Sequence, residues 1–251
     1  MPISQHTEAD ATASDKTLAE RALRLLRDDI LGGQLAPDTK LRLNALQDRY
    51  GLGLSPLREA LLRLSSEGMV KVEGQRGFAV AAVSLAELQD LTRARICLEA
   101  SALNEAMAHG DAEWEAQIIA AYHRLSRAPL PSDSADLEAA RLWEERHREF
   151  HHSLVAGCGS DWLLRLHSQL VDHSERYRKL RLLRHRDKAA RVRDVNAEHA
   201  AIMKAVLARQ VDKAAALMKK HLNATAQAMA RFLEPTPARA APRARKAKAV
   251  R

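Results

Sequence analysis

The sequence predicts a mainly α-helical protein, with a small N-terminal unit of three helices and a hairpin followed by a larger antiparallel bundle of helices. Three observations carry this prediction. Apolar residues recur at helical spacing along most of the 251 residues. Strand-like alternation occurs in one short stretch, residues 69–83. The breaks between the helical stretches are short, which is typical of antiparallel neighbours in a bundle.

The N-terminal unit is expected over residues 17–83, after a polar lead-in at residues 1–16 that is predicted to be disordered. A first helix is predicted at residues 17–32, where the apolar repeat stops at a glycine pair. Asn44 is expected to cap a second helix, and Gly51 to end it.

A third helix and two strands complete this unit. Ser55 is expected to cap the helix, with Pro56 in its first position and Gly68 at its end. The runs MVKVE and FAVAAV then alternate like two short strands on either side of a glycine-containing turn. Three helices and a hairpin within about 65 residues is the plan of a winged helix-turn-helix.

The remainder, residues 84–233, is expected to be an all-helical domain. Ser84 and Glu87 form a capping box at the start of its first helix. Further helices are predicted at residues 111–127, 135–157, 160–185, 188–208 and 211–233. The basic tail, residues 234–251, is predicted to be disordered.

Composition bounds the function without identifying it. The formal charge is +8 and the isoelectric point is near 9.8, but residues after Phe232 hold six basic side chains and one acidic one, and so supply five of the eight charges. Such tails bind nucleic acid weakly, so the net charge alone indicates little. Two distant cysteines, Cys97 and Cys158, form no disulfide framework or thiolate zinc motif. With no leader-like or membrane-spanning apolar run, the expected location is the cytoplasm.

The third helix, SPLREALLRLSSEG, is the reading helix in this plan. Arg58 lies one turn in, opposite the apolar stripe, where arginine can contact guanine through two hydrogen bonds. Ser55, at the helix N-terminus, suits a phosphate, and Arg49, Lys71 and Arg76 are expected to contact the phosphate backbone. The alternative is that Arg58 pairs only with solvent or with Glu59.

The run from ALRLLRDDILGGQLAPDTKL to SPLREALLRLSSEGMVKVEGQRGFAVA resembles the GntR family of bacterial regulators. The SPLREAL block, EGMV and the wing at Gly77 fall where that family has them, so Gly77 joins the expected DNA-binding residues. The rest of the chain resembles the all-helical effector domain of the fatty-acid-regulator-related group. WEERHREFHHSLVAGCGSDWLL is most similar to the carbon-starvation-induced regulator branch. Many members have Arg where this chain has Leu54, so that base contact is not carried over.

Spacing selects four of the eleven histidines. His147 and His151 are four residues apart and share one helix face. His199 lies eleven residues before Gln210 and His221 eleven after it, so a hairpin at Gln210 places both at one height. Three helices would then deliver four imidazoles to one point in the bundle, where metal sites are often built. The other seven are interpreted as solvated or packing residues: His6, His109, His123, His152, His167, His173 and His185.

The resemblance implies that His151, His199 and His221 hold a divalent cation, with His147 standing where the family usually has Asp. An all-nitrogen set favours Zn²⁺ or Ni²⁺ over Mg²⁺ or Ca²⁺. Arg95 matches a family arginine that faces the effector cavity, and Arg178 could join it. Together they suggest a small organic acid, such as a dicarboxylate, as effector. The alternative for both arginines is a surface salt bridge, with Glu99 or Glu175 for example, and for Arg178 this alternative is favoured.

The combined hypothesis is a DNA-binding transcription regulator, more specifically a repressor. It is expected to bind operator DNA at the bacterial nucleoid as a homodimer. Two alternatives remain open at this stage. A metalloenzyme could use the histidines to activate water, with Glu149 or Glu198 as base, although Glu149 lies on a different helix face from His147 and His151. An architectural DNA-binding protein could use the helical domain only to dimerise.

Overall fold

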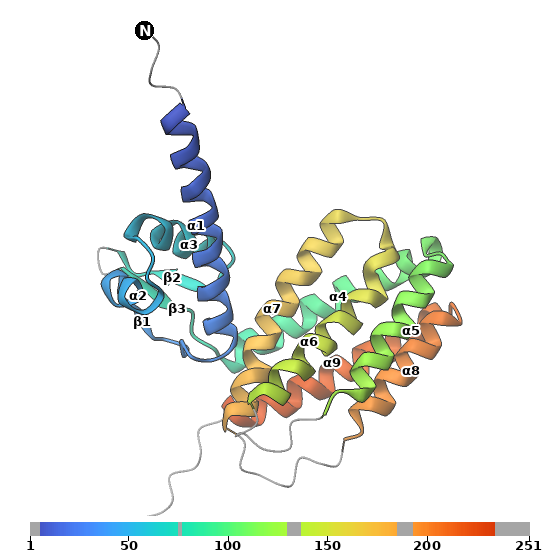
Figure 1. The fold of residues 1–251 in the computed structure, drawn as a ribbon. Coiled ribbons are helices and arrows are strands. Elements are labelled where there is room, and N and C mark those ends of the chain that lie inside the picture. The colour runs from blue at the N-terminus through green and yellow to red at the C-terminus, as the bar shows by residue number, and fades with distance from the viewer. Residues whose placement is uncertain (1–5, 75–76, 130–136, 185–192, 234–251) are drawn as a thin grey trace, which may run out of the picture.

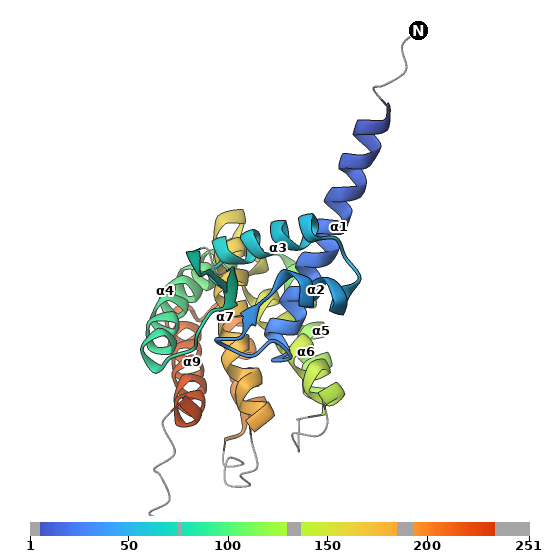
Figure 2. The same cartoon turned by 90° about the vertical axis from the view of Figure 1, so that its left-hand side faces the viewer.

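A computed structural model describes residues 6–74, 77–129, 137–184 and 193–233 (Figure 1). The N-terminal unit lies beside the helical bundle, and α7 is among the bundle helices nearest to it (Figure 1). Viewed from its own side, this unit presents α1, α2 and α3 in front of the bundle (Figure 2). The predicted mainly α-helical architecture of two parts is therefore confirmed.

The N-terminal unit contains three helices and a small antiparallel sheet. Its elements are α1 (His6–Leu31), β1 (Lys40–Leu41), α2 (Leu43–Tyr50), α3 (Leu54–Ser66), β2 (Val70–Val72) and β3 (Phe78–Val80). The strand order is β1-β3-β2, and Lys71 pairs with Ala79 in the predicted hairpin. The strand β1 was not predicted, because two residues are too few for alternation to show. A core that includes Leu26, Leu57 and Leu61 joins α1 to α3.

Three predicted helix starts differ from the structure. The helix α1 begins at His6, so residues 6–16, expected to be disordered, are helical, in keeping with their alanine content. Neither Asn44 nor Ser55 is an N-cap, because α2 starts after Arg42 and α3 after Gly53, both without a side-chain cap. The buried Leu46 of α2 and the Leu57 stripe of α3 hold these helices against the core, so packing sets their starts instead.

The bundle follows the predicted helix order. Its elements are α4 (Leu85–His109), α5 (Ala112–Arg127), α6 (Leu137–Val155), a 3₁₀ turn (Ala156–Cys158), α7 (Asp161–Arg184), α8 (Val195–Leu207) and α9 (Val211–Leu233). Ser84 caps α4 by accepting a hydrogen bond from Glu87 N at 3.1 Å, as predicted. The helix α8 begins at Val195, directly after its cap Asp194, so residues 193–194 of the predicted stretch 188–208 are not helical. Part of that predicted stretch lies outside the described residues.

The bundle core lies between α4, α5, α6, α8 and α9. Phe150 on α6 is fully buried, and Trp114 on α5 donates its indole N–H to Ser153 O at 2.8 Å. These contacts fix α6, the helix that carries the first two selected histidines. Of the helices described, none is long and apolar enough to cross a membrane. The predicted tail at residues 234–251 lies outside the described residues.

Candidate metal centre and nucleic-acid interface

The four histidines that spacing selects meet inside the bundle. His147 and His151 come from α6, His199 from α8 and His221 from α9. All four are buried, and one ligand atom from each lies within 4.8 Å of the others. The hairpin that this convergence requires is present, since α8 ends at Leu207 and α9 begins at Val211. The predicted meeting of three helices is therefore observed.

Three of these four histidines have buried ring nitrogens without a hydrogen-bond partner in the described part of the chain. Among the described residues, nothing accepts from or donates to either nitrogen of His151 or His199, or to Nδ1 of His147. Burial, reinforced by the neighbouring imidazoles, holds the pKa of each of these three histidines well below its usual range. Each ring is therefore neutral and has a lone pair to offer. Buried unsatisfied nitrogens are costly unless something binds them, so the donor set fits a metal ion.

The spacing of these nitrogens also fits an ion of the expected size. Zn²⁺–N bonds of about 2.0–2.1 Å place four tetrahedral ligand atoms roughly 3.3 Å apart. The observed separations, up to 4.8 Å, therefore need each ring to move inward by about 1 Å or less. His147 stacks on Trp143, with ring centroids 4.7 Å apart and planes 21° apart. Trp143 therefore holds the ring that stands in place of the usual aspartate.

A carboxylate outside the cluster orients His221. Glu198 Oε2 lies 2.9 Å from His221 Nδ1, and Arg193 contacts both Glu198 and the His221 carbonyl. Although partial burial alone would raise it, hydrogen bonds with His221 and Arg193 bring the pKa of Glu198 down to about 2. An ionised Glu198 fixes the N–H of His221 on Nδ1, which leaves Nε2 free for an ion. Glu198 is thus a positioning residue.

We expect Glu198→Gln to weaken binding of Zn²⁺ by about 10- to 100-fold, because partners of this kind set ring orientation and basicity. Competition with a chromophoric chelator measures the affinity. Glu149→Gln is the matched control, because Glu149 is also on the bundle surface but pairs with Arg124 and Arg146. Equal affinities for the two variants would show that Glu198 does not support the site.

Arg95 lies in the bundle interior beside this cluster. It donates to Glu99 Oε1 at 2.9 and 2.5 Å, and both side chains are almost fully buried. Glu99 Oε2 lies 4.0 Å from His151 Nδ1, so one carboxylate adjoins both the arginine and the cluster. The predicted alternative of a salt bridge with Glu99 has the right partner, but the pair is buried rather than on the surface.

Arg178 does not form the surface salt bridge that the sequence analysis favours. It is buried and donates to Glu144 Oε2 at 3.0 Å, so a surface salt bridge with Glu175 is wrong in both place and partner. Glu175 pairs instead with Arg148. The reason is that Glu144 lies on α6, one turn before His147, and faces α7 across the bundle. Arg178 is therefore near the cluster.

His167 is a further buried group that spacing did not select. It comes from α7, is 2% exposed, and neither ring nitrogen has a hydrogen-bond partner in the described part of the chain. Its Nε2 lies 3.9 Å from Glu99 Oε1, and burial lowers the pKa of the ring to about 4. No periodicity in the sequence distinguishes it from a packing histidine.

The exposed face of α3 carries the predicted DNA-reading side chains. Pro56, Leu57, Ala60, Leu61 and Leu64 are buried. Ser55 and Arg58 are exposed on the other side of the helix. Glu59, the alternative partner of Arg58, pairs instead with Arg63 at 2.5 Å. Leu54, the residue that departs from the family pattern, is 43% exposed at the helix start.

The residues predicted to contact phosphate differ in their surroundings. Lys71 is exposed on β2, whereas Arg49 on α2 is exposed but pairs with Asp29 of α1 at 2.5 Å. Arg76 lies outside the described residues. Gly77 has a φ of 99°, in the region that only glycine adopts readily, which explains its place at the turn of the wing.

Comparison with known proteins assigns both parts of the chain. Residues 18–80 match the family described as bacterial regulatory proteins, gntR family, and residues 90–224 match the FCD domain. The HTH-type transcriptional repressor GlaR of Escherichia coli (strain K12) is 41% identical over 199 residues, which cover 79% of this chain and 90% of GlaR. The uncharacterized HTH-type transcriptional regulator BphR of Paraburkholderia xenovorans (strain LB400) is 34% identical and covers 88% of each chain.

Solved structures show the same fold. The structure of E. coli McbR/YncC has a TM-score of 0.72 at 19% identity and covers 86% of this chain and 99% of its own. A GntR regulator from Rhodococcus sp. RHA1 has a TM-score of 0.65 at 20% identity, covering 84% and 97%. The family matches assign the chain to the DNA-binding transcription regulators rather than to metalloenzymes, as the sequence predicted. This chain belongs to the gntR family of bacterial regulatory proteins, with a winged helix-turn-helix followed by an FCD domain.

Proposed function

We propose that this protein is a transcription repressor that leaves its operator when a small organic acid binds at a Zn²⁺ or Ni²⁺ centre in the helical domain. The observation that carries the proposal is the convergence of four buried, neutral imidazoles from three helices. His147, His151, His199 and His221 would hold the ion. The similarity to GlaR, a transcriptional repressor 41% identical to this chain, supports the repressor role.

The chemistry of the ligands favours a carboxylate effector. Four neutral imidazoles leave a divalent ion its full charge, and five- or six-coordinate ions keep one or two positions for oxygen ligands. Arg95 and Arg178 lie in the same interior and are each neutralised by a glutamate. An acid with two carboxylates could bind the ion at one end and compete for Arg95 at the other. We therefore favour a dicarboxylate.

The reading helix requires a symmetric partner to bind DNA tightly. Winged helix-turn-helix regulators commonly bind as dimers, with one reading helix in each of two successive major grooves. We expect a homodimer bound to a pseudo-palindromic site whose half-sites are centred about 10 base pairs, or a multiple of that, apart. Selection from random DNA, with the protein's mass measured on the selected site, tests this. An asymmetric single site bound by one copy would contradict it.

The test of the sensor titrates dicarboxylates of increasing chain length against the complex with the selected DNA. We compare the wild type with a His199→Ala/His221→Ala variant, after checking that the variant binds this DNA in the absence of acid. The wild type should release DNA at an acid concentration at least about fivefold lower than the variant needs, since effector couplings are typically 5- to 150-fold. Release of both proteins at one concentration would show that the metal centre is not the sensor.

The alternative within the same family is an architectural DNA-binding protein whose helical domain only dimerises. A bundle with that role alone would gain stability by filling its centre with apolar side chains. The buried nitrogens of His151 and His199, which have no partner among the described residues, favour the sensor instead. In either case the site of action would be operator DNA at the bacterial nucleoid, in the cytoplasm.

A further inference from the structure

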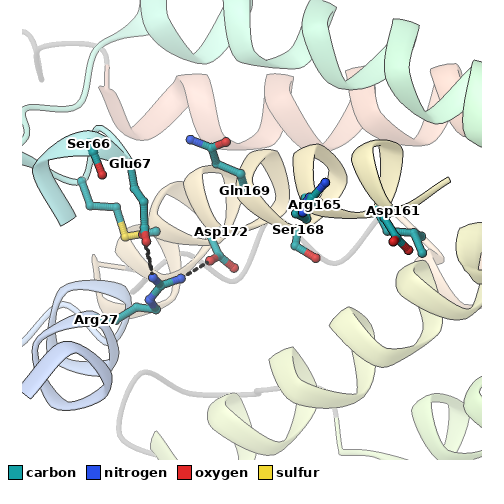
Figure 3. Close-up of a pocket in the computed structure, with 10 residues that line it drawn as sticks. Arg27, Ser66, Glu67, Asp161, Arg165, Ser168, Gln169 and Asp172 are labelled. Atoms are coloured by element: carbon teal, nitrogen blue, oxygen red, sulfur yellow. Dashed lines mark hydrogen bonds and ion pairs between the residues drawn. The ribbon is translucent and has the colours of Figure 1, made fainter. Parts of the chain in front are cut away.

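We propose that Asp172 on α7 links the metal centre to the reading helix, through Arg148 on one side and Arg27 on the other. The inference rests on the proposed function, because it names how occupancy of the centre would reach the DNA-binding unit. Figure 3 shows the side chains on the DNA-binding side of this link, where Arg27 of α1 lies between Glu67 and Asp172.

On the DNA-binding side, α7 contacts the end of the reading helix. Arg27 donates to both oxygens of Glu67, at 2.7 and 2.6 Å, and to Asp172 Oδ2 at 3.1 Å (Figure 3). Glu67 directly follows α3, and its carbonyl lies 2.7 Å from His173 Nε2. Glu67 at the C-terminus of α3 is therefore held by His173 directly and by Asp172 through Arg27.

The same helix also contacts the junction between the two parts of the chain. Arg176 donates to Ala81 O at 2.5 Å, directly after β3. The Tyr177 hydroxyl donates to Glu87 at 2.6 Å and lies 3.3 Å from Ser84 O. A displacement of α7 would thus move the end of α3 and the start of α4 together.

On the bundle side, α7 is tied to the helix that carries two of the metal ligands. Arg148 donates to Asp172 through one nitrogen and to Glu175 through the other. Arg148 follows His147 directly, so an ion that draws His147 and His151 inward would also reposition Arg148. One turn earlier on α6, Glu144 accepts from Arg178. Three ion pairs, made by the two α6 residues Glu144 and Arg148 on either side of His147, therefore connect α6 to α7.

Asp172 is the residue common to both sides. Its side chain is 8% exposed, and a buried carboxylate needs charged or hydrogen-bonding partners. It shares two guanidinium groups, each of which has a second acidic partner, Glu67 for Arg27 and Glu175 for Arg148. Movement of Arg148 with α6 changes its hold on Asp172, and this changes the position of Arg27 and of the end of α3.

The test uses Asp172→Asn, because both arginines keep their second acidic partners and the fold should persist. Asp161→Asn is the matched control, since Asp161 lies on the same helix and, with Arg27, Glu67 and Asp172, lines the pocket drawn in Figure 3. Arg27→Gln is the second variant, which leaves the contact between Asp172 and Arg148. The probe is Ni²⁺ alone. Trp143 fluorescence reports its binding, because that indole stacks on His147.

Two measurements report the coupling, namely the Kd for the selected DNA and hydrogen exchange of residues 67–70, each with and without Ni²⁺. In the wild type and Asp161→Asn, Ni²⁺ should tighten DNA binding by at least about fivefold and slow this exchange. Asp172→Asn and Arg27→Gln should bind Ni²⁺ with unchanged affinity. In these two variants, however, addition of Ni²⁺ should change the Kd for DNA by less than about twofold.

The outcomes separate the two proposals. If no protein binds Ni²⁺, the metal centre is wrong and the link falls with it. If the wild type binds Ni²⁺ without any change in exchange or in DNA affinity, or if both variants respond as the wild type does, the centre stands and the link is overturned.

Discussion

Replacing His199 and His221 together by alanine is expected to abolish the stabilisation of the folded protein by Zn²⁺. An ion that binds only the folded state adds about 2.7 kcal/mol to the free energy of unfolding at a concentration of 100 Kd. The variant keeps only His147 and His151, two imidazoles of one helix, and so loses the ligands from α8 and α9. Urea unfolding, with and without Zn²⁺ at 100 times the wild-type Kd, measures this difference.

His152→Ala is the matched control, because His152 is exposed on α6 directly after His151. It should retain the full stabilisation. A second variant, His147→Asp, restores the residue that the family usually has at this position, and should keep a metal site while shifting its preference toward harder ions such as Mn²⁺. If Zn²⁺ stabilised the double-alanine variant as much as the wild type, the cluster would not be the metal centre.

The histidine cluster could be predicted because its geometry is encoded locally. One pair of histidines is fixed by the turn of a single helix, and the other by equal distances from one hairpin at Gln210. Its surroundings could not. Glu99, Glu144 and Glu198 approach the cluster from three helices. The residue that each of them meets depends on how distant helices pack, and no spacing in the sequence records that. Arg178 was therefore assigned to the wrong partner.

The order of helices was also predictable, since it follows from apolar periodicity, but several helix starts were not. Ser84 caps α4 as expected, at the junction between the two parts of the chain. Asn44 and Ser55 lie within helices that the core already holds, through Leu46 and Leu57, so burial outweighs the capping preference. A cap contributes about 1 kcal/mol, which is less than the roughly 1.5–3 kcal/mol gained by burying a single large apolar side chain.

Arg58→Ala is expected to weaken binding to the selected DNA by about 1–3 kcal/mol, or roughly 5- to 150-fold, and to relax the preference at one base pair. The side chain is exposed on α3, opposite the buried stripe, and its neighbour Glu59 is engaged by Arg63. It is thus available for the two-hydrogen-bond contact with guanine. Kd values on the selected site and on each single-base variant measure the effect.

Lys71→Ala provides the contrast, because Lys71 is exposed on the wing strand β2 and is expected to contact phosphate. Loss of one phosphate contact should weaken binding about equally on all sequences and reduce the slope of log K against log salt by about 1. Arg58→Ala should leave that slope nearly unchanged while flattening the sequence preference, because a base contact neutralises no phosphate. If Arg58→Ala lost equal affinity on selected and random DNA, with the slope reduced, then Arg58 would contact phosphate and another residue of α3 would read the base. Leu54, 43% exposed one helical turn earlier, would then be the first residue to test, through contact with a thymine methyl group.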